Sequence, residues 1–206
     1  MSRTADFFCR ALLALVMTGG SGFCTVAAMA GEVEDGAEDG RLAQSRTLVA
    51  DFAGDLLQAL QQALETGGPI AAIPACRDLA PELASAASRA SGAAVGRTSR
   101  RFRNPLNAPE PWQVVVLETF QVQMATGVAA VPEYFDVAED GSARYMKAIV
   151  LGPPCVVCHG STLSPELEAL LDAQYPHDRA RGYSVGDLRG AFTVFWPAPG
   201  EGGGAR

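Results

Sequence analysis

The segment Cys-Val-Val-Cys-His, from Cys155 to His159, constrains this chain more than any other feature of its sequence. It holds two of the 5 cysteines and one of the 2 histidines in the 206 residues. Two thiols and an imidazole at this spacing can form a disulfide, hold a zinc ion, act as a redox dithiol or attach a haem group. The compartment of the protein and its other cysteines bear on which of these chemistries applies.

The first 30 residues have the features of a secretory signal peptide. Arg3 and Arg10 precede an apolar stretch, which ends in the small-residue pattern Ala-Met-Ala at Ala30. The apolar run is interrupted by glycines and is shorter than the ~20 residues that a membrane-spanning helix needs. We therefore expect cleavage after Ala30, export to the periplasm, and no stable membrane insertion of the mature protein.

Removal of this peptide leaves three cysteines, Cys76, Cys155 and Cys158, which cannot all pair with one another. In an oxidising compartment, the leftover thiol needs a role. The whole chain has a net charge of −7, and it stays acidic without its first residues. This charge disfavours nucleic acid and anionic lipid as partners.

We expect one domain, residues 46–197, between an acidic flexible lead-in at 31–45 and a flexible tail at 198–206. Leucine or phenylalanine recurs every fourth residue from 48 to 64, which predicts a helix that the sequence Gly-Gly-Pro from Gly67 ends. The apolar stripe of this helix would cover a sheet or, in a homodimer, a second copy of the chain.

The rest of the domain alternates helix and strand signals. Helices are expected at 81–89, at 112–125 with Pro111 in the first turn, and after the capping residue Ser164. Strands are expected at 93–97, on both sides of the turn Asp140-Gly141, and at 189–196. Strands in the second half, with helices over one face, indicate an α+β domain with an antiparallel sheet.

The order of residues in the Cys155–His159 segment separates the possible chemistries. A zinc site would need a fourth ligand such as His177, and the adjacent pair Cys158 and His159 fits the usual ligand spacing poorly. A redox dithiol has no need of the following histidine. Attachment of haem c requires two thiols that add to the vinyl groups and a histidine that binds the iron. We predict one covalent haem c per chain on Cys155 and Cys158, with His159 as an axial ligand.

The second axial ligand remains open on these grounds. The candidates are Cys76, His177, Met124 and Met146. Each has an ordinary structural alternative: a buried small side chain for Cys76, a solvated loop for His177, and core packing for the two methionines. An unpaired thiol in an exported protein is the argument in favour of Cys76.

Five blocks of the sequence resemble, in order, a family of bacterial c-type haem domains formerly classed as of unknown function. The blocks are "AAIPACRDLAPELA", "VGRTSRRFRNPLNAPEPW", "RYMKAI", "CVVCHG" and "YPHDRARGYSVGDLRGAFTVFW". The resemblance runs from about Arg46 to Trp196. It implies a PAS-like antiparallel sheet with a long N-terminal helix, and an unusual His/Cys coordination in which Cys76 binds the iron opposite His159. Ala148 departs from the proline that many members have, and it touches no proposed ligand.

Basic residues in these blocks are candidates for the haem propionates, because guanidinium groups suit bidentate carboxylate contacts. We single out Arg97, Arg103 and Arg189 as cofactor-binding residues. The alternative is a solvated basic loop in an acidic protein.

The resemblance implies no single activity, since similar domains occur both as standalone periplasmic proteins and as sensing parts of longer signalling chains. We expect a redox or small-ligand sensor that a redox or signalling partner protein recognises. The alternative is a monohaem electron-transfer cytochrome. No acid-base pair or open-site constellation can be found in the sequence, so we do not expect an enzyme.

Overall fold

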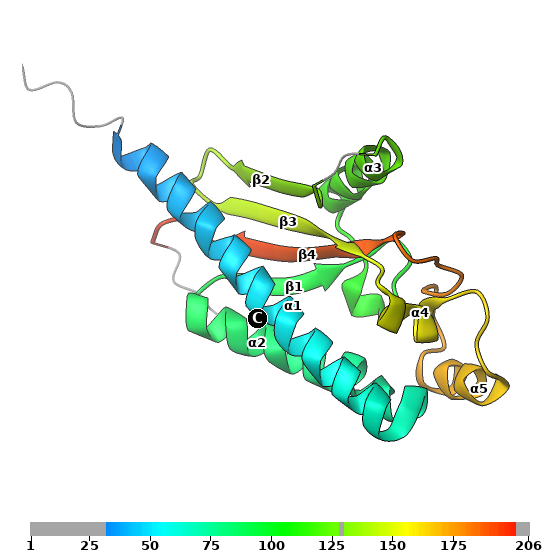
Figure 1. Cartoon of the computed structure of the whole chain (residues 1–206). Helices are drawn as coiled ribbons and strands as arrows, with labels where there is room; N and C mark the ends of the chain where they lie inside the picture. Colours follow the sequence, from blue (N-terminus) through cyan, green and yellow to red (C-terminus); the bar gives the residue numbers. More distant parts are fainter. Residues whose placement is uncertain (1–31, 128–129, 201–206) are drawn as a thin grey trace, which may run out of the picture.

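The computed structural model describes residues 32–127 and 130–200, which form a sheet with helices around it (Figure 1). In chain order the elements are α1 (Glu32–Pro74), the π-helix η1 (Ala75–Leu79), α2 (Ala80–Ser91), β1 (Ala94–Thr98), the 3-10 helix η2 (Pro105–Asn107), α3 (Pro111–Ala125), β2 (Glu133–Val137), β3 (Ala143–Val150), α4 (Pro153–His159), α5 (Pro165–Gln174) and β4 (Leu188–Trp196). The predicted signal peptide, and residues 201–206 of the predicted tail, lie outside the described residues. No helix in the described part of the chain is both long and apolar enough to cross a membrane.

The four strands form an antiparallel sheet in the order β1-β4-β3-β2. β2 and β3 are a hairpin around Asp140 and Gly141, in register from Glu133 opposite Lys147 to Val137 opposite Ala143. β4 lies between β3 and β1, so the last strand of the chain joins the first strand to the hairpin. The prediction of an α+β fold with an antiparallel sheet and a long N-terminal helix is confirmed.

Helix α1 lies across one face of the sheet (Figure 1). Its apolar stripe meets side chains of β3 and β4, and the rings of Phe52 and Phe192 lie edge to face with centroids 5.3 Å apart. Phe52 is 3% exposed, and Tyr145 of β3 is fully buried. The stripe therefore covers the sheet of its own chain, and the homodimer that we predicted would have to use another face of α1.

The opposite face of the sheet is covered by α3, whose buried side chains Val116, Leu117 and Phe120 pack on Met146 and its neighbours. Successive residues of a strand point to opposite faces, so a strand with two buried faces has buried neighbours such as Tyr145 and Met146. Our expectation that the helices cover only one face is wrong for this reason.

Two boundaries of the first helix differ from those predicted. α1 begins at Glu32 and runs through the expected lead-in, where Ser45 is fully buried and accepts a hydrogen bond of 2.8 Å from Trp196 Nε1. At the predicted end of the helix, Gly68 leaves the helical conformation with φ of 69°, which glycine adopts without strain. The backbone is helical again from Pro69, because proline suits the first turn of a helix. The Gly-Gly-Pro sequence therefore kinks α1 and does not end it, as we had predicted it would.

The segments after the kink and after β3 meet beyond one end of the sheet. Ile73, near the end of α1, packs on Leu167 and Leu171 of α5, with Cys158 of α4 against the same cluster. Figure 1 shows α4 and α5 beyond the sheet, beside the C-terminal part of α1. This end of the molecule holds the Cys155–His159 segment.

The contact between α1 and the sheet predicts a large loss of stability when Phe52 is truncated. Phe52→Ala should lower the free energy of unfolding by about 3–5 kcal/mol, because it removes a buried ring and leaves a cavity. Leu57→Ala, on the same helix but 43% exposed, should change it by less than ~1 kcal/mol. Urea unfolding of both variants measures the difference. Similar losses in the two variants would contradict the packing of α1 on the sheet.

Candidate functional site

The Cys155–His159 segment forms most of the short helix α4. Gly152 precedes the helix, Pro153 and Pro154 occupy its first turn, and its backbone hydrogen bonds end at Gly160. Cys155 and Cys158 are three residues apart and therefore lie on the same side of the helix. Both are free thiols and partly buried. Burial raises the pKa of Cys158, so its sulfur is held as a neutral thiol.

His159 has one ring nitrogen engaged and one available. Its Nδ1 lies 2.7 Å from the carbonyl oxygen of Ala180. A carbonyl only accepts hydrogen bonds, so Nδ1 carries the proton and Nε2 has a free lone pair. Burial lowers the pKa of His159 well below its ordinary value, and the nearby Arg189 and Arg103 lower it further. A neutral imidazole with this tautomer is the form that binds a metal ion through Nε2.

Residues 178–183, which we call the strap, hold the C-terminal end of α4. Besides the contact of Ala180 with His159, the amide of Tyr183 donates to the His159 carbonyl at 3.0 Å, and that of Gly182 donates to the Gly160 carbonyl at 2.8 Å. The Tyr183 ring also lies edge-on to the imidazole, with centroids 6.4 Å apart. The strap thus fixes both the backbone and the ring of His159.

Cys76 comes from η1 and is the third free, partly buried thiol. Burial raises its pKa, and the charge of Arg97 is the largest opposing effect. Cys155, Arg103 and Arg189 also act on its pKa, so Cys76 lies among the residues that we predicted for the site. The fold therefore brings Cys76, 79 residues before Cys155 in the sequence, close to α4.

The three predicted arginines have different partners. Arg103 is bonded to other parts of the protein. Its Nη2 donates to the Cys158 carbonyl at 2.6 Å, and its side chain is only 11% exposed. Arg189 Nη1 donates to Ser99 Oγ and the Arg101 carbonyl, and its Nε, like that of Arg103, is buried without a hydrogen bond. Arg97 stacks 5.8 Å from the Phe52 ring and has no hydrogen-bond partner among the described residues.

These differences bear on which arginines can hold an anion. Burial lowers the pKa of both Arg97 and Arg189, which is the electrostatic cost of a buried cation without a counter-charge. A carboxylate would relieve that cost, so Arg97 and Arg189 fit the propionate role that we predicted. Arg103, by contrast, has a counter-charge 3.2 Å away in Asp178, and it contacts the backbone of α4 and the strap.

Glycine at position 190 is required for the placement of Arg189. Gly190 has φ of 156°, and a Cβ there would collide with the carbonyl oxygen of Thr98 in β1. The close approach lets Ser99 Oγ donate to the Arg189 carbonyl at 2.7 Å. β1 and β4 are thereby held together at the start of β4, next to the site.

Of the four candidates for a second axial ligand, the structure brings Cys76 to the segment. Met146 is fully buried on the α3 side of the sheet, and Met124 lies in α3 itself. His177 is exposed in the loop before the strap. Among residues 32–127 and 130–200, no group of three or more His, Cys, Asp or Glu side chains is arranged to hold a metal ion alone, so the zinc alternative finds no ligand set there.

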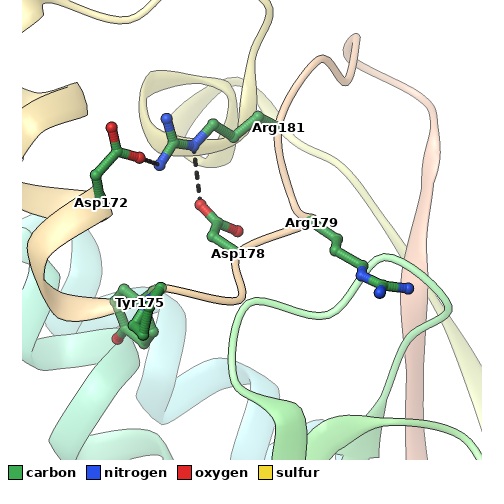
Figure 2. A pocket seen from close by; sticks show the side chains of 6 residues that line it. Asp172, Tyr175, Asp178, Arg179 and Arg181 are labelled. Carbon is green, nitrogen blue, oxygen red and sulfur yellow. Dashed lines mark hydrogen bonds and ion pairs between the residues drawn. The ribbon is translucent and has the colours of Figure 1, made fainter.

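A pocket of about 440 Å³ lies outside the strap. Its lining is Asp172, Tyr175, Pro176, Asp178, Arg179 and Arg181. Figure 2 shows Arg181 reaching between Asp172 and Asp178, while Arg179 points away from both. No cysteine and no histidine lines this pocket.

Sequence reasoning missed the residues that hold His159. Tyr183 and Asp178 lie in the block "YPHDRARGY", in which we considered only His177 as a ligand. The group that binds the imidazole is the backbone carbonyl of Ala180, and a carbonyl has no sequence signature. The Asp-x-Ala order indicates a side-chain-to-backbone turn, but nothing in the sequence links it to α4.

Comparison with known proteins agrees with this description. The model of the Tll0287-like family matches residues 32–197. The crystal structure of the cyanobacterial heme-protein Tll0287 superposes with a TM-score of 0.62 at 24% sequence identity, over 76% of this chain and 94% of that one. The two share the fold, and no curated protein matches the chain. Since the family model spans the whole region from α1 to the end of β4, the chain belongs to the Tll0287-like family.

Proposed function

We propose that this protein is an exported, PAS-like, single-haem c-type sensor rather than an enzyme. Cys155 and Cys158 attach the haem, and His159 and Cys76 are its axial ligands. The observation that carries the proposal is the neutral His159 ring, whose Nδ1 is engaged by Ala180, in the same short helix as two free thiols. The match to a heme-protein supports the same cofactor. Bound haem would supply a one-electron iron couple.

The side chains around the segment fit the parts of a haem group. Cys155 and Cys158 would hold the group through thioether bonds. His159 would offer Nε2 to the iron, while Arg97 and Arg189 would offer guanidinium groups to the propionates. Periplasmic export follows from the predicted signal peptide, residues 1–30, and places the protein where haem c is attached.

Cys76 supports a sensing role because of its place in the fold. It lies in η1, a π-helix between the kinked α1 and α2, and π-helical turns occur frequently at functional sites. A thiolate donates charge to ferric iron and favours that state. Reduction would weaken the bond from Cys76, and the segment from Ile73 to Leu83 could then change the surface that a partner protein meets.

One observation favours the alternative, an electron-transfer cytochrome. Val157, between the two attaching cysteines, is 37% exposed, so α4 lies at the surface. A haem attached there would have an edge near solvent, which favours electron exchange with another protein.

Covalent attachment predicts how the haem responds to extraction. Wild-type protein matured in a c-type system should keep its haem in acidified acetone, whereas the double variant Cys155→Ala/Cys158→Ala should release all of it. Cys76→Ala is the matched control, because it removes a thiol from the same cluster and should leave both thioethers in place. Extractable haem from the wild type would rule out attachment.

Ligation by Cys76 predicts a change in spectrum and potential. Cys76→Ala should abolish the low-spin His/thiolate spectrum of the ferric protein and raise the midpoint potential, within the roughly 0.8 V range over which axial ligands tune haem. His177→Ala should change neither quantity, since His177 is exposed. Spectroelectrochemical titration measures both. If Cys76→Ala left the ferric spectrum unchanged, another residue would be the ligand.

Sensing and electron transfer predict different hydrogen exchange. A sensor must interact differently with its two states, so exchange from Ile73 to Leu83 should be faster in the ferrous than in the ferric protein. Residues of α3, on the far face of the sheet, serve as an internal control and should exchange equally. Identical exchange throughout, with rapid electron transfer to a soluble cytochrome, would favour the alternative.

A further inference from the structure

We propose that Asp178 is a positioning residue that fixes the orientation of His159 through the backbone of Ala180. The proposal rests on the proposed function, in which His159 binds the haem iron. It gives a role to a buried carboxylate outside the Cys155–His159 segment.

Two of the three hydrogen bonds of Ala180 link Asp178 to the imidazole, and the third is a longer one, 3.4 Å, from Arg103 Nη2 to its carbonyl. Asp178 Oδ1 accepts the amide N–H of Ala180 at 2.8 Å. The carbonyl of the same residue accepts His159 Nδ1–H at 2.7 Å. Because both polar groups of Ala180 are engaged, the position of the carbonyl that holds the ring depends on the carboxylate that holds the amide.

The second carboxylate oxygen connects Asp178 to the arginines on either side of the strap. Asp178 Oδ2 lies 2.9 Å from Arg181 Nε and 3.2 Å from Arg103 Nε. Arg103 in turn donates to the carbonyl of Cys158, immediately before His159. Asp178 therefore acts on the histidine from two directions, through the strap and through the last turn of α4.

The burial of Asp178 shows that this arrangement is built into the structure. Its side chain is 3% exposed, and a buried carboxylate is costly unless it is paired and hydrogen-bonded. Burial alone would raise the pKa of Asp178, but the Ala180 amide, Arg103 and Arg181 more than offset it, so the pKa is lower than usual. The partners of Asp178 are thus sufficient to keep it charged inside the protein.

Fixing the ring matters because partners of a ligating histidine set its tautomer and its angle to the metal. Without Asp178, the Ala180 carbonyl would keep only the longer contact from Arg103 Nη2 besides the ring itself, and the direction of Nε2 would be less tightly fixed. Asp172 offers a matched comparison. It also binds Arg181, at 2.5 Å, but it is 65% exposed and lies in α5, outside the strap (Figure 2).

The test compares Asp178→Ala, Asp178→Asn and Asp172→Asn in the full haem-loaded protein. Asp178→Ala should lose the single wild-type ferric spectrum and show a second, weakly ligated species. Asp178→Asn keeps an oxygen for the Ala180 amide and should retain the wild-type spectrum with a lower unfolding temperature. Asp172→Asn should match the wild type in spectrum. Loss of the bond should also make exchange of the Ala180 amide about 10- to 100-fold faster in Asp178→Ala.

Each failure has a separate signature. A wild type without covalent haem overturns the proposed function, whatever the variants show. Covalent haem in the wild type with an unchanged spectrum in Asp178→Ala overturns the positioning role alone. If Asp178→Ala does not fold, hydrogen exchange of the wild-type protein still tests the positioning role. Fast exchange of the Ala180 amide in the wild type would show that Asp178 does not hold the strap.

Discussion

The hydrogen bond between His159 and the Ala180 carbonyl is the interaction on which the site depends. Helix α4 has only seven residues, and a helix this short does not hold its last side chain in place by itself. The strap supplies the missing constraint through the backbone of His159 and Gly160. Since the strap leads through residues 184–187 into β4, the geometry of the imidazole is tied to the central strand pair of the sheet.

The fold also buries positively charged side chains around the site. The charges of Arg97, Arg103 and Arg189 all act on the pKa of Cys76, and Asp178 pairs with Arg103 but not with the other two. Within the described residues, Arg97 and Arg189 have no carboxylate within ion-pair distance. A protein interior tolerates such cations only with a compensating anion. In the proposed function, the propionates of the haem and a thiolate at Cys76 would supply this negative charge.

Local patterns of the sequence predicted most of the fold. The hairpin at Asp140-Gly141, Pro111 in the first turn of α3, the cap of α5 at Ser164, and the strands follow from turn chemistry and from periods of two and 3.6 residues. The misses have physical causes. The end of α1 was mistaken because a Gly-Pro pair also permits a kink when residues further along, here Ala72 and Ile73, are buried. The second covered face was missed because α3 is apolar on both sides, so its pattern does not show which side packs.

The site could be predicted only where side chains themselves have the function. Cys155, Cys158 and His159 follow from their spacing, and Cys76 was implied by resemblance. The strap could not be found, because its hydrogen bonds to α4 are made by backbone groups that any residue provides. Contacts between segments this far apart in the sequence form only in the packed fold.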